Sequence, residues 1–370
     1  MEFHVERDVL LHSLTHIQGV VEKKNTLPIL SNVLIQATEE GLLVTATDMD
    51  MIISEKINAN VKVNGSTTTG AQALYDVVRK LPSNSQLNFA LIDESKLKLI
   101  SGMSDYELTC LSPNEFPILE DNIEEEPTVI ESKQFLKLLN KTKFAISNDE
   151  TRHYLNGIYL GFDQNDKSKL IAVATDGHRL CKTLIEVQDM KNFQSIILPK
   201  KTIFELLTIL GDENKDLKII STKSKIKFII DNIILISKVI DGKFPDYEKV
   251  IPKDERDEIK ADVIKFSNAL DRLRALSSDR KGVVKIKIEN NNITFNIKDI
   301  THGGGIEKIE ANYKGKVLEI GFNSNYLIDV AGVLESKEII LKAKDSTSPI
   351  LIRDNNDKSS TYVVMPMRVV

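Results

Sequence analysis

The pattern of hydrophobic and polar positions repeats three times along the chain. Each repeat opens with alternating apolar residues, typical of a short strand, and continues with apolar residues at three- and four-residue spacing, typical of an amphipathic helix. These openings lie at residues 3–21, 129–147 and 259–277. In the first of them, Val9, Leu10, Leu14 and Ile17 form the apolar face of the predicted helix.

Each repeat continues with strands and a second helix, predicted over residues 72–81, 201–210 and 325–334. The first two repeats share the tetrapeptides TATD (45–48) and VATD (173–176), and similar turns at 114–117 and 242–245. In the third, residues 283–297 read as two alternating strands around an Asn-rich turn. A large α+β protein could show such runs by coincidence, but the shared order and spacing favour one unit used three times.

The predicted fold class is therefore α+β, with three repeated domains that each pack two helices on an antiparallel sheet. We expect the domains to span residues 1–125, 126–254 and 255–370, because charged segments beside proline lie at both boundaries. Three copies in a row leave two unsatisfied ends. A second chain joined end to end would close such an array into a ring.

Composition and charge narrow the possible functions. Hydrophobic residues make up 41% of the chain, too many for a disordered protein, and no apolar run is long enough to cross a membrane. The first ten residues lack a signal-peptide pattern, so we expect a cytoplasmic protein with no membrane partner. Cys110 and Cys181 lie far apart in sequence, which predicts buried apolar fillers in strands instead of a disulfide or thiolate site.

Charge is distributed unevenly among the three domains. The first carries 9 basic and 19 acidic side chains, the second 21 and 18, and the third 19 and 17. A head-to-tail contact between the acidic first domain and the slightly basic third would be electrostatically complementary.

Basic side chains nevertheless recur on the predicted helices. Lys133, Lys137 and Lys141 are spaced by four residues along the second repeat's first helix. Taken singly, such a face is usually just solvated. Taken together, the helices would offer a basic lining that contacts phosphates without reading bases. Other basic residues at predicted helix ends are Lys23, Lys24, Arg79, Lys80, Lys200, Lys201, Arg272, Arg274, Arg280 and Lys281.

Candidate catalytic groups are sparse. Asp176 and His178 place a carboxylate near an imidazole, which leaves a hydrolase as the alternative function, but no known nucleophile, metal-hydrolase or nucleotide-binding motif is present. Asp48 and Asp50 are expected on one face of a strand, without a metal. The glycines 303–305 are expected in a mobile loop.

The histidines give no metal-ligand spacing. His12 and His16 could share a helix face, but the sequence offers no third ligand nearby, and both are expected on the solvated side. We therefore expect no metal and no cofactor.

Five short motifs carry a resemblance to a known family: TLPIL (26–30), YLNG (154–157), ATDGHRL (174–180), FPDY (244–247) and YVVMPMR (362–368). In this order, and spread over all three repeats, they resemble the bacterial sliding clamp, the beta subunit of DNA polymerase III. The resemblance implies a non-catalytic homodimer, closed head to tail into a six-domain ring around duplex DNA. It also implies contacts with the catalytic subunit of DNA polymerase III, the clamp loader, other polymerases and repair proteins.

The resemblance and the basic pattern together suggest which residues contact DNA. Asp149 and His153 depart from the family's familiar pattern before Tyr154, and the acidic Asp149 would weaken phosphate contact there. The expected DNA-contacting residues are Lys24, Arg79, Lys137, Lys141, Arg152, His153, Tyr154, Lys200, Lys201 and Arg272.

The resemblance also implies a partner-peptide cleft between the second and third domains. Two methionines would give it a deformable apolar wall, and Pro366 would blunt strand pairing. Lys249 stands where an arginine is familiar, and Val370 is an extra terminal residue. The expected cleft residues are Leu155, Thr175, Gly177, His178, Arg179, Leu180, Pro245, Val250, Asn323, Tyr326, Val363, Val364, Met365, Pro366, Met367 and Arg368.

Overall fold

The computed structural model describes residues 1–22, 27–118, 123, 125–163, 166, 168–187, 193–253, 256–277, 282–299 and 301–368. The chain divides into two compact units. Unit 1 contains residues 1–134 and 188–239, and unit 2 contains residues 135–187 and 240–370. The central segment of the chain therefore contributes to both units. Helix α3 (Ser132–Thr142) begins in unit 1 and continues in unit 2.

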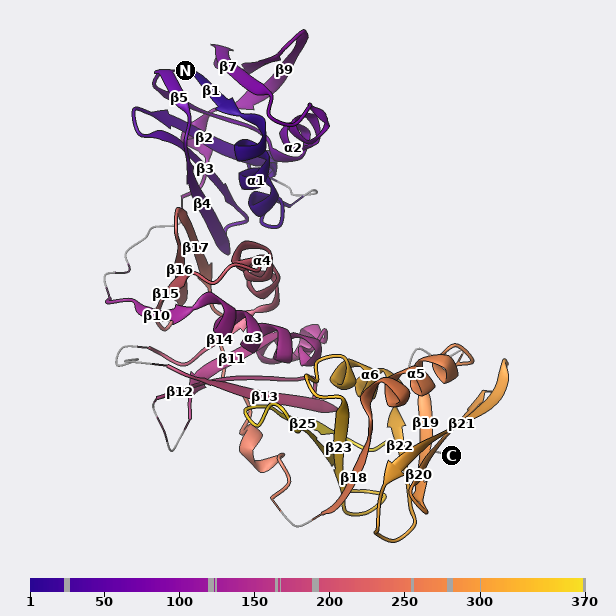
Figure 1. Ribbon diagram of the computed structural model, residues 1–370. Coiled ribbons are helices and arrows are strands. Elements are labelled where there is room, and N and C mark those ends of the chain that lie inside the picture. The colour runs from indigo at the N-terminus through magenta and orange to yellow at the C-terminus, as the bar shows by residue number, and fades with distance from the viewer. Residues whose placement is uncertain are drawn as a thin grey trace. The chain divides into compact units, whose positions relative to one another are not determined.

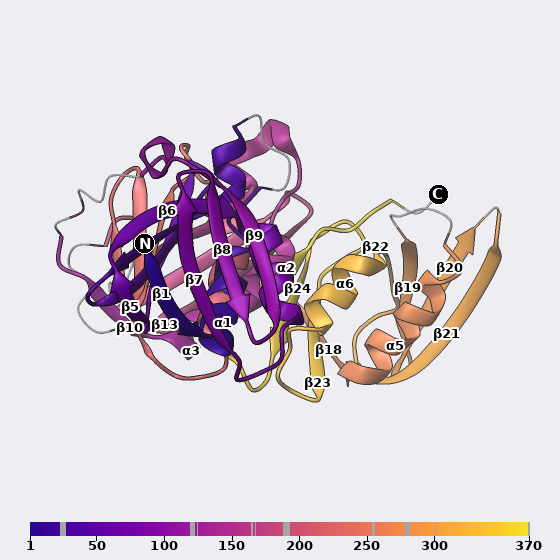
Figure 2. The same cartoon turned by 90° about the horizontal axis from the view of Figure 1, so that it is seen from above.

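Unit 1 is built on one antiparallel sheet with the strand order β10-β15-β16-β17-β4-β3-β2-β6-β9-β8-β7-β1-β5 (Figure 1). Pairing of β17 with β4 joins its central-segment strands to its N-terminal strands. The strands of this sheet are β1 (Glu2–Glu6), β2 (Asn32–Thr38), β3 (Gly41–Thr47), β4 (Met51–Ile57), β5 (Asn60–Val63), β6 (Gly65–Gly70), β7 (Gln86–Asp93), β8 (Lys96–Ser101), β9 (Ser104–Leu111), β10 (Thr128–Glu131), β15 (Asp216–Ser221), β16 (Lys225–Ile230) and β17 (Ile233–Lys238). Unit 1 also contains the short strand β14 (Ile196–Pro199), which does not belong to this sheet. Its helices are α1 (Arg7–Ile17), α2 (Ala71–Lys80) and α4 (Lys200–Leu210), with short 3-10 helices at Pro28–Ser31 and Pro113–Glu115. Figure 2 shows β7, β8 and β9 running side by side.

Unit 2 is also built on an antiparallel sheet, with the strand order β11-β12-β13-β25-β24-β23-β18-β21-β20-β19-β22. Its strands are β11 (Gly157–Phe162), β12 (Lys169–Thr175), β13 (Arg179–Glu186), β18 (Asp257–Asp262), β19 (Val283–Glu289), β20 (Asn292–Asp299), β21 (Gly303–Asn312), β22 (Leu318–Asn323), β23 (Glu338–Ala343), β24 (Ile350–Asp354) and β25 (Thr361–Val364). Besides most of α3, it contains α5 (Val263–Arg274), α6 (Ser324–Ala331) and 3-10 helices at Lys143–Ala145, Glu150–Leu155 and Tyr247–Lys249.

The predicted repeat is confirmed at the level of elements. Each of the three openings is a strand that runs directly into a helix: β1 into α1, β10 into α3, and β18 into α5. The second helix of each repeat is also present, as α2, α4 and α6. Figure 1 shows α1 beside α2, and α5 beside α6, as their contacts require. The expected boundary after residue 254 lies outside the described residues, so the exact domain limits stay a prediction.

Helix α5 shows why these segments fold as they do. Its buried residues Phe266, Ala269, Leu270 and Leu273 recur at three- and four-residue spacing, so one face packs on the sheet. Phe266 meets Phe295 of β20 edge to face, with ring centroids 5.3 Å apart. The helix begins where the Asp262 carboxylate accepts the backbone N–H of Lys265, which satisfies a donor that the first turn cannot.

A buried arginine joins α1 to α2. Arg7 Nε donates to the carbonyl oxygen of Val78 at 2.9 Å, and Arg7 Nη2 donates to that of Arg79. These carbonyls lie in the last turn of α2, where the Val78 oxygen also accepts the backbone N–H of Leu81 at 3.3 Å. The guanidinium adds hydrogen bonds to this end of the helix and complements the negative end of the helix dipole.

Several local predictions can be compared with the structure. Cys110 and Cys181 lie buried in β9 and β13, as expected. The loop prediction for glycines 303–305 was wrong, because these residues open strand β21 and pair with β20. Asp48 and Asp50 were also predicted wrongly. They lie in the tight turn between β3 and β4, where Asp48 Oδ1 accepts the backbone N–H groups of Asp50 and Met51. Among the described residues, no helix is both long and apolar enough to span a membrane.

Candidate functional site

A cavity of about 290 Å³ lies within unit 2, and we call it the unit-2 cleft. Strand β13 pairs with β25, which places Leu180 opposite Val363 although 183 positions separate them in the sequence. The 3-10 helices Glu150–Leu155 and Tyr247–Lys249 supply further walls. The cleft is lined by Arg152, Tyr154, Leu155, Thr175, Gly177, Arg179, Leu180, Pro245, Tyr247, Val250, Val363 and Met365.

The turn between β12 and β13 shapes one edge of the cleft. Asp176 Oδ1 accepts the backbone N–H groups of His178 at 2.8 Å and Arg179 at 3.0 Å. Gly177 has a φ of 89°, and a Cβ there would lie 2.8 Å from Nη1 of Arg152. Both the backbone conformation and the close arginine therefore favour glycine at this position.

Arg179 is a fixed part of the cleft wall. Its Nε donates to Asp176 at 3.1 Å, its Nη1 to Asp329 at 2.5 Å and its Nη2 to the carbonyl oxygen of Phe144 at 2.5 Å. The guanidinium also lies 4.5 Å above the ring centroid of Tyr326. Its side chain is only 11% exposed. A guanidinium held on every side cannot swing toward a ligand, so it shapes the cleft.

Aromatic packing supports the opposite wall. The ring centroids of Tyr247 and Tyr159 lie 6.0 Å apart. The Tyr159 ring stacks on Phe244, with centroids 5.3 Å apart. Lys182 Nζ lies 5.4 Å from the Tyr247 ring centroid and forms an ion pair with Glu248. Burial raises the pKa of Tyr247 well above its ordinary value, so the phenol stays neutral.

Backbone hydrogen bonds anchor the segment that follows β25. The N–H of Met365 donates to the carbonyl oxygen of His178 at 2.8 Å, and the N–H of Met367 donates to that of Gly321 at 2.8 Å. The Met365 side chain is thereby held at the cleft. Methionine side chains adapt their shape readily, so this wall suits ligands of different outline.

The structure brings together nine of the sixteen expected cleft residues. Three others adjoin the lining: the His178 ring stacks on Tyr326 with centroids 6.4 Å apart, and Tyr326 bonds to Asn323. Val364 is fully buried in the core instead. Pro366, Met367 and Arg368 follow Met365 and do not line the cavity.

Three lining residues were not expected in the cleft. Arg152 and Tyr154 were predicted to contact DNA, and Tyr247 was named only within a family motif, with no role in the site. The FPDY motif contains Tyr247 and was the available signal for it. Asp149 holds this region in shape, because it accepts from Thr151 and Arg152 and caps the 3-10 helix.

The lysines of α3 do not form the uniform line that their spacing suggested. Lys137 Nζ lies 3.1 Å from Glu335 and 3.8 Å from Asp357, with its side chain 39% exposed. Lys141 pairs with the same two carboxylates, donates to the carbonyl oxygen of Val333 at 2.6 Å and is only 6% exposed. The expectation that Lys141 offers its charge to phosphates was therefore wrong, because the ammonium is buried in an intramolecular network.

Other expected DNA contacts are exposed, although several have acidic neighbours. Arg79 pairs with Asp76 at 3.4 Å, Lys201 with Asp48 at 2.5 Å, and Arg272 with Glu307 through two hydrogen bonds. Lys200 and His153 are exposed as well. Lys24 lies outside the described residues. These ion pairs lower the positive potential that each basic group can offer.

Comparison with known proteins finds the same family in all three parts of the chain. Family models of the DNA polymerase III beta subunit match residues 1–120 (N-terminal domain), 129–246 (central domain) and 248–368 (C-terminal domain). The beta sliding clamp of Caulobacter vibrioides is 36% identical, with both chains covered completely. The chain belongs to the bacterial beta sliding clamp family.

Solved sliding clamps have the same fold as this member of the family. The DnaN sliding clamp of Bartonella birtlesii, solved with bound griselimycin, superposes with a TM-score of 0.96 at 38% identity, with both chains covered completely. A beta sliding clamp of Caulobacter crescentus gives 0.94 at 37% identity, with 100% of this chain and 99% of that chain covered. The expected three-domain clamp fold is confirmed.

Membership in this family sets the hydrolase alternative aside, because the beta sliding clamp is a non-catalytic processivity factor. The local geometry agrees. Both oxygens of Asp176 serve the turn and Arg179, while the ring of His178 stacks on Tyr326. A Ser-His-Asp type of site uses a carboxylate to orient the imidazole, and Asp176 does not do so here because its oxygens are used elsewhere.

Proposed function

We propose that this chain forms a head-to-tail homodimeric ring that encircles duplex DNA and tethers the replicative polymerase. The unit-2 cleft is the observation that carries the tethering part of the proposal. It is a preformed cavity with apolar side chains on its walls and a few fixed polar groups at its edge, which suits a short peptide segment.

The ring requires two different surfaces that fit each other. The first domain exposes Ile92 (53%) and Met103 (104%), and the third exposes Ile264 (63%), Ile306 (69%) and Val317 (61%). Each domain therefore offers large apolar side chains that an interface would remove from water. Because these two sets belong to different domains, a contact between them is heterologous and can close into a ring. The acidic first domain and slightly basic third add charge complementarity.

Contacts with DNA should be weak and independent of sequence. Topological linkage keeps a ring on DNA, so strong base contacts would only stop it from sliding. The acidic partners of Arg79, Lys201 and Arg272 fit this requirement, because each phosphate contact must compete with an existing ion pair. The proposed contacts are Lys24, Arg79, Lys137, Arg152, His153, Tyr154, Lys200, Lys201 and Arg272.

The cleft is proposed to take short linear motifs from partner proteins. Candidate partners are the catalytic subunit of DNA polymerase III, the clamp loader, other polymerases and repair proteins. Apolar side chains of the motif would enter between Leu180, Val363 and Met365, and Arg179 would set the depth of the cavity. The neighbouring His178, Asn323, Tyr326, Pro366, Met367 and Arg368 would contact flanking residues.

Retention on circular DNA tests the ring directly. After loading onto nicked circular duplex by a clamp loader, the protein should co-elute with the DNA through gel filtration. Cutting the DNA once should release it, because a ring slides off a free end. A protein that stays bound after linearisation, or never co-elutes under loading conditions, would contradict the proposal.

A further inference from the structure

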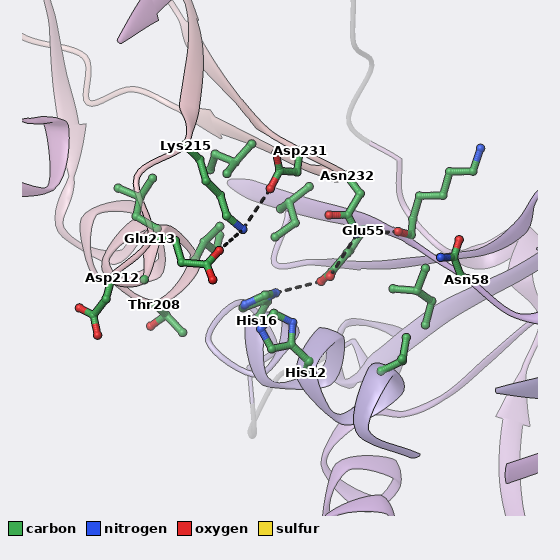
Figure 3. Close-up of a pocket in the computed structure, with 18 of the residues that line it drawn as sticks. His12, His16, Glu55, Asn58, Thr208, Asp212, Glu213, Lys215, Asp231 and Asn232 are labelled. Atoms are coloured by element: carbon green, nitrogen blue, oxygen red, sulfur yellow. Dashed lines mark hydrogen bonds and ion pairs between the residues drawn. The ribbon is translucent and has the colours of Figure 1, made fainter. Parts of the chain in front are cut away.

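A second cavity, of about 760 Å³, lies within unit 1 and differs chemically from the unit-2 cleft. Figure 3 shows that α1 presents His12 and His16 to it, and that Glu55 of β4 faces His16. Lys215, Glu213 and Asp231 lie across the cavity from them. We call it the unit-1 cavity.

Three potential metal ligands meet at one side of this cavity. His12 and His16 are one helical turn apart, and their ring centroids are 4.5 Å apart. His16 Nδ1 lies 2.9 Å from Glu55 Oε2. One ligand atom from each of the three residues lies within 4.8 Å of the other two. The expectation that His12 is solvated is confirmed. For His16 it was wrong, because His16 is 5% exposed, and Glu55, which is 3% exposed, supplies the third ligand that was not expected.

This set of side chains suits zinc. Two histidines four residues apart on a helix present nitrogen ligands on one face, and a carboxylate completes a His₂Glu set. Zinc bonds of about 2.0–2.2 Å in tetrahedral geometry place neighbouring ligands about 3.3–3.6 Å apart. His16 Nδ1 and Glu55 Oε2, now hydrogen-bonded at 2.9 Å, would move apart by about half an ångström to hold the ion. The exposed His12 can reach it by rotating its side chain.

The surroundings favour a cation independently of the ligand geometry. Glu205 of α4 is 4% exposed, and its Oε1 has no hydrogen-bond partner in the described part of the chain. Its carboxylate lies near His16. Asn232 Nδ2 lies 3.5 Å from Glu55 Oε1 and can orient that carboxylate from outside the ligand set. A bound divalent cation would compensate the buried acidic groups.

We propose that His12, His16 and Glu55 bind a divalent transition-metal ion, with Zn²⁺ as the best match. The fourth coordination position would face the unit-1 cavity and hold water. Bound metal would join α1 to β4 and so stabilise the first domain. The proposal is independent of the proposed ring and of the unit-2 cleft.

The test is a titration of untagged full-length protein with Zn²⁺ by isothermal calorimetry. We expect one site per chain, and an affinity at least tenfold weaker in His12→Ala. His12 is exposed, so this substitution should leave the fold intact. His302→Ala is the matched control, because His302 is also exposed and also has a neighbouring carboxylate, Asp299. This control should bind as tightly as the unchanged protein.

Absorption of bound Co²⁺ gives a second measurement. It reports directly whether residue 12 is a metal ligand, so a purely structural role of His12 would not change it. Co²⁺ in the site should show visible ligand-field absorption. In His12→Cys, the thiolate should restore binding relative to His12→Ala and add a sulfur-to-cobalt charge-transfer band. Equal Zn²⁺ affinity of the unchanged protein and His12→Ala, no binding by either, or an equal loss in His302→Ala would each overturn the proposal.

Discussion

The unit-1 cavity and the unit-2 cleft contrast two ways of making a binding site. The larger one, of about 760 Å³, holds imidazoles and carboxylates, whereas the smaller one, of about 290 Å³, is walled by aliphatic and aromatic side chains. In the first, affinity depends on a few ligand atoms at fixed separation. In the second, it depends on apolar area removed from water. Substitutions should therefore act on one site without affecting the other.

The largest expected effect is on the unit-2 cleft. Deleting residues 365–370 removes Met365 and the backbone anchors to His178 and Gly321. Binding of a clamp-binding peptide should be lost, while dimerisation and Zn²⁺ affinity stay unchanged. Fluorescence anisotropy with a labelled peptide measures the first, and sedimentation with calorimetry the others. Unchanged peptide affinity would refute the cleft assignment.

The next effect concerns the buried charges beside α3. Lys141→Met would leave the carboxylate of Asp357, which is 4% exposed, without its buried partner, at an expected cost of about 3–5 kcal/mol in unfolding free energy. Lys137→Met is the matched control, because the half-exposed Lys137 should contribute less than about 1 kcal/mol. Urea unfolding followed by circular dichroism compares them. Equal losses would mean that burial does not distinguish these lysines.

The pH dependence of this network has a definite sign. Burial by itself would raise the pKa of Asp357, but hydrogen bonds from Ser359 and Ser360 and the charges of Lys137 and Lys141 lower it to about 2. The stabilisation is therefore present above pH 3.8, the ordinary pKa, and is lost as the pH falls toward 2. Removing Lys141 should shift this acid-induced loss to higher pH.

Glu205 of α4 should show the opposite pH dependence of stability. Burial raises the pKa of Glu205 to about 7 from 4.5, so its contribution to stability is full below 4.5 and declines as the pH rises through 7. In the presence of a chelator, Glu205→Gln should gain about 2–3 kcal/mol over the unchanged protein between pH 4.5 and 8. The exposed Glu213→Gln is the control. A pH-independent difference in urea midpoint would contradict the raised pKa.

The smallest expected effects are on retention on DNA, and they come from basic side chains outside both cavities. Arg79→Glu and Arg272→Glu should shorten retention on DNA at low salt and make little difference at high salt, because the contacts are screened. Each loss should reduce the salt dependence of binding by about one released counterion. Arg274→Glu, also on α5 and paired with Asp271, is a comparison for Arg272. Retention that is identical at every salt concentration would remove both residues from the DNA-facing set.

The repeat pattern predicted much of the fold because it depends on local periodicity. A helix expected over residues 72–81 is observed as Ala71–Lys80, and one expected over 201–210 as Lys200–Leu210. Strand β21 was missed because glycines resemble a loop in sequence. The pairing with β20 shows why glycine is needed at one of these positions, because a Cβ on Gly304 would lie 2.7 Å from the carbonyl oxygen of Ile297.

Side-chain environments could not be predicted from spacing alone. The four-residue spacing placed Lys137 and Lys141 on one face correctly, but the carboxylates that bury Lys141 come from residues 335 and 357. Likewise, Glu55 lies 39 positions from His16 and reaches it only because α1 packs on β4. The cleft residues were found through family motifs, since one chain's periodicity cannot show that β13 meets β25.

Because β13 pairs with β25 at the cleft, binding of a ligand there is coupled to the stability of unit 2. Leu180 and Val363 line the cavity and are also register partners in that pairing. A ligand that requires both walls binds only while the strands remain joined, and by thermodynamic linkage it opposes their separation. Any partner bound there therefore stabilises the pairing of β13, from the central part of the chain, with β25, from its C-terminal part.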